Sequence, residues 1–204
     1  MMMSRNEVKK NLFVLSGPSG CGKDTVIKCL KLLRDDIFLS VSCTTRSPRI
    51  GEKEGVDYYY ISKERFLEMI EKDEILEYNF YAGNYYGTSR SELDRGLAEG
   101  KIMMLVIDVN GAHNVRRLYP EANLIFLMPP SIDALRARIA ARGSTNDIEE
   151  RMKIAEAEIE DSVNFDYRLV NDDLDTCVRE LSEYIDFVVN DKKYMEEEEN
   201  NAET

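Results

Sequence analysis

Short apolar runs alternate along this chain with longer stretches in which apolar residues recur at the helical period. The first run, Asn11 to Ser16, predicts a buried strand, and a helix over about 23–33 follows it. Later in the chain the pattern predicts strands over 102–108, 123–128 and 167–170, a helix between the first two, and helices over 131–141, 147–163 and 173–189. This alternation is typical of an α/β fold, in which helices cover a parallel sheet.

The stretch from about 36 to 100 follows a different pattern. It is rich in tyrosine, and it contains β-rich pieces and helical segments in turn, at 57–61, 63–71, 75–87 and 89–99. We therefore expect an α+β subdomain inserted into a core that is formed by residues 11–35 and 101–190. Such an insertion would supply the second wall of a cleft.

The composition is that of one globular domain of 204 residues, 43% hydrophobic and 32% charged. The formal net charge of −12 disfavours general nucleic-acid binding. One histidine, and four cysteines without a CxxC pair, disfavour a zinc site. No membrane segment and no leader pattern is evident, so we expect a cytoplasmic protein. The acidic end, about 191–204, predicts a disordered tail.

A glycine-rich turn joins the first predicted strand to the first predicted helix. Its sequence, GPSGCGK, places Gly17, Gly22 and Lys23 in the spacing G-x-x-x-x-G-K. Glycines leave backbone N–H groups free to surround an anion, the helix start adds partial positive charge, and the lysine neutralises the outer phosphates. The turn predicts a P-loop NTPase core. The alternative is an ordinary strand-to-helix turn in which the glycines serve only geometry.

Six motifs resemble those of guanylate kinases and follow one another in the same order. They are SGPSGCGK (16–23), SVSCTTRSPR (40–49), GVDYYY (55–60), GNYYGT (83–88), IDVNG (107–111) and VNDDLD (170–175). The resemblance covers the chain from about Leu12 to Phe187. It implies transfer of the γ-phosphoryl group of ATP to GMP, and also to dGMP, with Mg²⁺. It also implies a parallel sheet flanked by helices, an inserted α+β GMP-binding subdomain and a helical lid over about 138–160.

The resemblance assigns the acceptor site to eight residues. Two arginines would clamp the phosphate dianion with forked donors, and two tyrosine hydroxyls would complete its cage. An acid and nearby polar groups would read guanine, whose N1–H and N2 amine are donors. Each residue also has a structural alternative as a surface arginine, a strand tyrosine or an exposed acid. The set is Ser42, Arg46, Arg49, Tyr58, Glu77, Tyr86, Thr88 and Asp108.

The resemblance also assigns the ATP site and the lid. The lid arginines would stabilise negative charge on the moving phosphoryl group, and lid closure would exclude water. The implied catalytic set is Lys23, Arg46, Arg138, Arg142 and Arg151. The implied ATP-binding set is Gly17, Pro18, Ser19, Gly20, Cys21, Gly22, Lys23, Asp24, Thr25 and Asn171. The alternative for these arginines, and for Arg136 especially, is pairing with glutamates at helical spacing.

Two positions depart from the family. Asp24 stands where a serine or threonine is usual, and Val106 stands where an acid is common. We expect the Asp24 carboxylate to lie on the metal side of the site and to replace both missing groups. Repulsion from a phosphate at about 4 Å would be roughly 4 kcal/mol at an effective dielectric of 20, and attraction to a divalent cation about twice that. The competing interpretation is that Asp24 impairs catalysis.

Other functions stay open at this point. One is a P-loop kinase for another phosphorylated acceptor, such as a ribose bisphosphate, although the guanine-reading set argues against it. Another is a non-catalytic module that binds phosphopeptides, although such domains typically lose the phosphate loop. We expect ATP and GMP as partners, no nucleic acid or membrane, and a monomer or homodimer.

Overall fold

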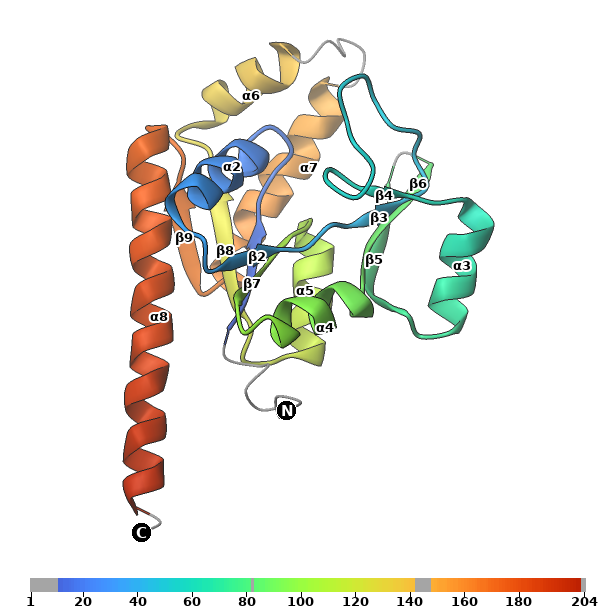
Figure 1. Ribbon diagram of the computed structural model, residues 1–204. Helices are drawn as coiled ribbons and strands as arrows, with labels where there is room; N and C mark the ends of the chain where they lie inside the picture. Colours follow the sequence, from blue (N-terminus) through green and yellow to red (C-terminus); the bar gives the residue numbers. More distant parts are fainter. Residues whose placement is uncertain (1–10, 82, 142–147, 203–204) are drawn as a thin grey trace. The chain divides into compact units, whose positions relative to one another are not determined.

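The computed structural model describes residues 11–81, 83–141 and 148–202 (Figure 1). The chain divides into two compact units. Each unit combines two separate stretches of sequence. The first unit comprises Met1–Ser16 and Asp36–Leu124, and the second comprises Gly17–Asp35 and Ile125–Thr204.

The first unit contains three parallel strands in the order β2-β7-β1. They are β1 (Leu12–Ser16), β2 (Ile37–Leu39) and β7 (Ile102–Val106). β1 is buried along its whole length, which explains why it reads as a continuous apolar run rather than an alternating one. Two helices pack beside these strands, α4 (Arg90–Ala98) on β7 and α5 (Val109–Leu118) on β1.

A second, four-stranded sheet in the same unit has the order β4-β3-β6-β5. Its strands are β3 (Cys43–Thr44), β4 (Tyr59–Tyr60), β5 (Ile75–Tyr81) and β6 (Asn84–Ser89). β5 and β6 are antiparallel neighbours. Ser62 caps helix α3 (Lys63–Glu71), since its side chain accepts from the Arg65 N–H. The helix buries Phe66 and Met69 against Cys43 and Ile75. The predicted helix over 63–71 is confirmed.

The second unit carries the helix that follows the glycine-rich turn, α2 (Lys23–Leu33), with α6 (Ile132–Ala141), α7 (Ile148–Asp161) and α8 (Leu174–Ala202). A 3₁₀ turn, Ser162–Asn164, leads into β9 (Tyr167–Val170), which is parallel to β8 (Asn123–Met128). β8 begins in the first unit and ends in the second. α2 packs beside α8, and Arg34 after α2 pairs with Asp186 on α8 at 2.7 Å.

Three features differ from the sequence-based expectation. β2 and β3 were not predicted, because strands of three and two residues are too short to carry a period. β2 pairs with β7 and so belongs to the parallel sheet, although it lies at the start of the predicted insertion. α8 extends to Ala202, past the start of the predicted disordered tail, because glutamate is a good helix former despite its charge.

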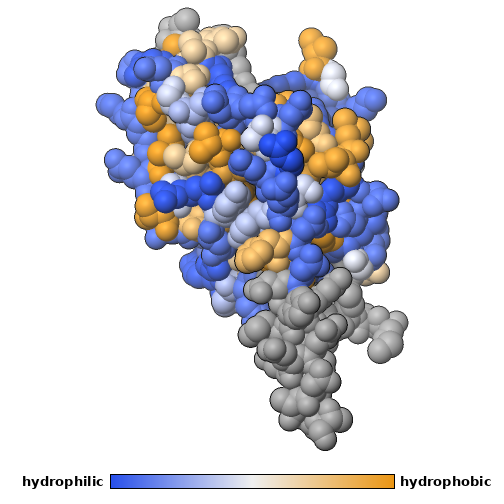
Figure 2. Space-filling model, turned by 90° about the vertical axis from the view of Figure 1, so that its left-hand side faces the viewer, coloured by the Kyte–Doolittle hydropathy of each residue, from blue (hydrophilic) through white to orange (hydrophobic). Residues whose placement is uncertain are grey.

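The surface has no continuous apolar band on the face drawn in Figure 2, where orange and blue residues are intermingled. Within the described ranges, no helix is both long and apolar enough to cross a bilayer.

Candidate active site

The glycine-rich turn after β1 depends on left-handed backbone that glycine adopts freely. Gly17 has φ 140° and Gly22 has φ 102°. A Cβ on Gly17 would lie 2.5 Å from the Leu127 carbonyl oxygen, and a Cβ on Gly22 would lie 2.5 Å from Asn171 Nδ2. Both predicted motif glycines are therefore required by backbone conformation and by close packing. Pro18 and Gly20 complete the turn, and Cys21 donates its N–H to the Pro18 carbonyl at 3.2 Å.

The start of α2 offers N–H groups and a positive charge. The Gly22 carbonyl accepts from the N–H groups of Thr25 and Val26, both at 3.0 Å, so the N–H groups of Lys23 and Asp24 lie at the helix end without an intrahelical acceptor. Lys23 Nζ donates to the carbonyls of Gly17 at 2.5 Å and Pro18 at 3.2 Å. The ammonium group therefore lies over the turn, where an anion bound by the N–H groups would meet it.

Asn171 supports the turn through a hydrogen bond to its backbone. It is 7% exposed, and its Nδ2 donates to the Cys21 carbonyl at 2.7 Å, while its N–H donates to the Met128 carbonyl at 2.9 Å. Cys21 is fully buried, and this burial raises the pKa of its thiol. The thiol is therefore held in its unreactive protonated form.

Two predicted lid arginines contact the turn. Arg138, from α6, donates to the Cys21 carbonyl at 3.3 Å and to the Asn171 carbonyl at 3.4 Å. Arg151, from α7, donates to Ser19 Oγ at 2.9 Å, and its buried Nε has no hydrogen-bond partner among the described residues. A buried guanidinium N–H without a partner is costly, and it indicates a place for an anionic ligand.

Two further arginines, Arg136 and Arg142, lie in or next to the predicted lid region of the sequence. Arg136 forms a bidentate ion pair with Glu149. The partner is a glutamate, as the alternative interpretation expected, but it lies on the next helix, α7, and not at helical spacing on α6. Arg142 lies outside the described residues. Asp24 and Thr25 are both exposed in the first turn of α2, where their oxygens are available to solvent.

In the first unit, Arg46 lies in a cage of tyrosines and one acid. Both terminal nitrogens donate to Glu52, each at 2.9 Å. The guanidinium carbon is 5.3 Å from the centre of the Tyr58 ring and 5.9 Å from that of Tyr60. The rings of Tyr58 and Tyr86 meet edge to face, with centroids 6.1 Å apart. The structure thus brings Arg46, Tyr58 and Tyr86 together as predicted, whereas the Arg49 side chain is exposed.

Glu52 is a residue that the motifs did not single out. Besides Arg46, it accepts from the Arg49 N–H at 2.7 Å and from the Tyr60 hydroxyl at 2.8 Å. The bond to Arg46 lowers the pKa of Glu52 to about 2. Burial, and then the bond to Glu52, raise the pKa of Tyr60 to about 12. The sequence does contain one indication of the role of Glu52. It lies six residues after Arg46, in the same loop, and a carboxylate there is a natural ion-pair partner for the guanidinium.

Glu77, on β5, is the buried acid of the predicted base-reading set. It is 5% exposed and accepts at one oxygen from the Thr88 N–H at 3.0 Å and hydroxyl at 2.8 Å. The pKa of Glu77 is raised to about 7, chiefly by burial; the Thr88 hydrogen bonds oppose the rise, and the charge of Asp108 adds to it. A Cβ on Gly111 would lie 2.7 Å from the second oxygen, so that glycine makes room for the carboxylate.

Asp108 precedes α5 and caps it. Its Oδ1 accepts from the Gly111 N–H at 2.8 Å, and its Oδ2 accepts a short hydrogen bond from Asn79 Nδ2. Asn79 is the second residue that the motifs missed. Ser42 lies half-buried just before β3, and its carbonyl accepts from the Tyr59 N–H at 2.9 Å.

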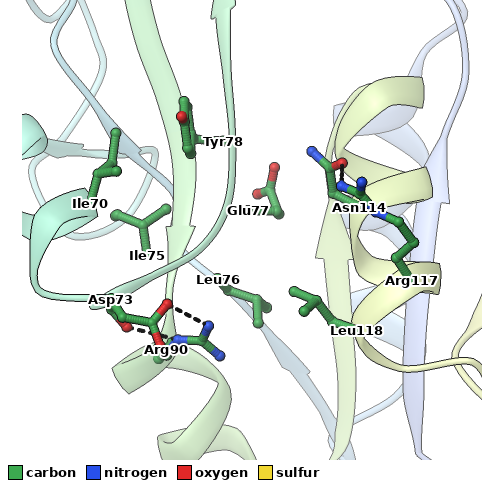
Figure 3. A pocket seen from close by; sticks show the side chains of 10 residues that line it. All are labelled: Ile70, Asp73, Ile75, Leu76, Glu77, Tyr78, Arg90, Asn114, Arg117 and Leu118. Atoms are coloured by element: carbon green, nitrogen blue, oxygen red, sulfur yellow. Dashed lines mark hydrogen bonds and ion pairs between the residues drawn. The ribbon is translucent and has the colours of Figure 1, made fainter.

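A surface pocket of about 510 Å³ lies beside Glu77, between β5 and α5 (Figure 3). Ile75, Leu76 and Leu118 give it apolar walls. Arg90 lies at its edge, where it donates to the carbonyl and the carboxylate of Asp73. In Figure 3 Glu77 lies in the middle of the pocket, between Ile75 and Tyr78 of β5 on one side and Asn114 of α5 on the other.

Comparison with known proteins identifies relatives over most of the chain. The family described as guanylate kinase matches residues 9–187. A guanylate kinase of Synechocystis sp. is 42% identical over 187 residues, covering 91% of this chain and 98% of its own. One from Prochlorococcus marinus is 46% identical over 178 residues, covering 86% and 97%. The crystal structure of guanylate kinase from Anaplasma phagocytophilum aligns with a TM-score of 0.71 at 35% identity, covering 85% of this chain and 83% of that one.

Proposed function

This chain belongs to the guanylate kinase family and transfers the γ-phosphoryl group of ATP to GMP, and we propose that the two sites described above hold the two nucleotides. ATP belongs to the glycine-rich turn of the second unit, and GMP to the Arg46 and Glu77 region of the first. Phosphoryl transfer asks little covalent chemistry of a protein, so these residues act by positioning the reactants and by stabilising negative charge.

At the ATP site, the N–H groups at the start of α2 surround the phosphates. Lys23 then exchanges its carbonyl partners Gly17 and Pro18 for the outer phosphates. Arg151 turns its unpartnered Nε, and Arg138 its guanidinium, toward the transferred group. Asn171 holds the turn in place through its hydrogen bond to the Cys21 carbonyl. The proposed ATP site therefore combines the positive charges of the lysine and the two arginines with backbone N–H donors that the fold already holds in position.

At the GMP site, the observation that carries the assignment is the buried Glu77. Guanine presents two adjacent donors, N1–H and the N2 amine, and an ionised carboxylate accepts both. Adenine presents no such pair, so its binding would leave a buried acid without partners, and the site rejects it. Arg46, supported by Tyr58 and Tyr86, binds the phosphate dianion, and Arg49 moves in from its exposed position.

The residues at the start of α2 fit Mg²⁺, a hard cation that prefers oxygen ligands. Asp24 would hold it through an exposed carboxylate, with the Thr25 hydroxyl beside it. The described residues contain no group of three His, Cys, Asp or Glu able to hold a metal ion, so phosphate oxygens and water would complete the shell. When bound, Mg²⁺ neutralises charge on the phosphates.

A titration of ATP binding against Mg²⁺ tests the role of Asp24. The Asp24 carboxylate repels the phosphates without metal and attracts the cation when it is present, so we expect a steeper Mg²⁺ dependence than in an Asp24→Ser variant. Lys28→Ser, on the exposed side of the same helix, is the matched control. Equal dependence in the native protein and Asp24→Ser would remove Asp24 from the metal site.

A coupled assay of ADP formation tests the choice of acceptor. We expect turnover with GMP and dGMP, and a kcat/KM at least about 10³-fold lower with AMP, because a site built to pair donors rejects an analogue that lacks them. Ribose bisphosphate should give no turnover. Comparable rates with AMP and GMP would contradict the proposed role of Glu77.

A further inference from the structure

The hairpin of β5 and β6 places four polar side chains on one face. Glu77 lies opposite Thr88, and Asn79 lies opposite Tyr86. Residues two apart on a strand point to the same side, so Asn79 shares a face with Glu77, and Tyr86 shares one with Thr88. Three of these four belong to the proposed GMP site. Asn79 therefore lies between the residue that reads the base and the tyrosine near the phosphate clamp.

The Asn79 amide is fixed at both ends. Its oxygen accepts from the Phe80 N–H at 2.8 Å, and its nitrogen donates to Asp108 Oδ2. Only this orientation satisfies both contacts, because the carboxylate needs a donor and the N–H needs an acceptor. An aspartate at position 79 would face the Asp108 carboxylate with a like charge.

Asp108 is consequently held at both of its oxygens. Gly111 donates to Oδ1 at 2.8 Å, and Asn79 donates to Oδ2. Each carboxylate oxygen has two lone pairs, so one pair on each remains for a ligand. The Gly111 N–H caps α5 by donating to Oδ1, but this one hydrogen bond does not fix the rotation of the carboxylate about the Cβ–Cγ bond of Asp108. Asn79 supplies the second fixed point.

We propose that Asn79 is a positioning residue for guanine recognition, which fixes the Asp108 carboxylate so that its remaining lone pairs accept from the exocyclic amine of the base. This inference rests on the proposed placement of GMP at Glu77 and Asp108. The amide suits this role because it orients one carboxylate without adding a charge beside the buried Glu77.

The first test compares GMP with IMP, which lacks the exocyclic amine, in an Asn79→Ala variant. KM for GMP should rise about tenfold, the effect of about 1.4 kcal/mol, whereas KM for IMP changes less than twofold and KM for ATP stays unchanged. The kcat/KM preference for GMP over IMP therefore falls about tenfold. Asn164→Ala is the matched control, because Asn164 makes the same amide-to-carboxylate bond, to Asp161 at 2.8 Å, in the second unit.

A double-mutant cycle separates positioning from a structural role. Asp108→Asn keeps a good helix cap, and by itself it should raise KM for GMP. If Asn79 acts through Asp108, adding Asn79→Ala to that variant should change KM for GMP by less than twofold. Equal losses for GMP and IMP, or fully additive effects in the cycle, would overturn the inference. If Glu77→Gln and Asp108→Asn both leave KM for GMP unchanged, the proposed GMP site itself is wrong.

Discussion

At the scale of single residues, the proposed acceptor site contains two acids with opposite pKa shifts. Glu77 is buried against Thr88, and its pKa is raised to about 7 by burial. Glu52 is held by Arg46, which lowers its pKa to about 2. A carboxyl group with a raised pKa favours the folded state in its protonated form, so its contribution to stability is full below its ordinary pKa and is lost as pH rises through about 7. Glu52 behaves in the opposite way.

The titration of Glu77 predicts pH-dependent GMP binding. The ionised carboxylate accepts from guanine, and Thr88, Gly111 and Asp108 are the groups that face it. With a pKa of about 7, its ionised fraction rises about tenfold between pH 6 and pH 8, and GMP affinity should rise by the same factor. Calorimetric titration would measure this. Glu77→Gln, which retains the titration of the GMP phosphate, should bind weakly and lose this step; an unchanged profile in the variant would contradict the assignment.

The Glu52 contacts predict an acid-sensitive contribution to folding. The ionised carboxylate holds Arg46, the Arg49 N–H and Tyr60. This stability is present above the ordinary pKa of a glutamate and is lost as pH falls through about 2. In urea unfolding at pH 7, Glu52→Gln should therefore be less stable than the native protein, and the difference should close toward pH 2. The exposed Glu121→Gln is the control. A constant difference at all pH values would argue against the ion pair.

At the scale of elements, the sequence predicted what short-range pattern controls. α2 covers the predicted 23–33, because a glycine turn fixes its start and one apolar face fixes its length. β9 also lies at the predicted 167–170. The contacts of Glu52 and Asn79 could not be predicted, since each joins segments whose approach depends on strand pairing and loop path. The family motifs named the residues that we propose to contact nucleotide and omitted Glu52 and Asn79, which hold two of those residues in place.

The support of the glycine-rich turn by Asn171, the residue that follows β9, can be tested by substitution. Asn171→Ala removes the hydrogen bond to the Cys21 carbonyl, at a cost of about 1–3 kcal/mol in free energy of unfolding. KM for ATP should rise several-fold, and KM for GMP should not change. Asn123→Ala is a close control, because Asn123 is also a buried amide that donates to a strand carbonyl, that of Leu12. It should lose stability without raising KM for ATP. Equal effects of the two variants on ATP would mean that Asn171 has no specific role in the turn.

At the scale of the whole molecule, the two proposed sites belong to different units. Every described residue of the proposed GMP site lies in Asp36–Leu124 of the first unit. The glycine-rich turn, Arg138, Arg151 and Asn171 lie in the second unit. In the proposed assignment, a chain with a net charge of −12 binds two anionic substrates at two local groups of cationic side chains, which act against the field of the molecule as a whole.

This separation predicts that each nucleotide alone protects its own unit in hydrogen exchange. GMP at about 100 times its Kd should stabilise the bound form by about 2.7 kcal/mol, with slowed exchange in β5, β6 and the start of α5. ADP with Mg²⁺ should slow exchange in the turn before α2, because its phosphates accept from those N–H groups. Glu77→Gln should abolish the GMP pattern and retain the ADP pattern, which makes it the internal control. Protection of the glycine-rich turn by GMP alone, equal to that given by ADP, would contradict the assignment of one nucleotide to each unit.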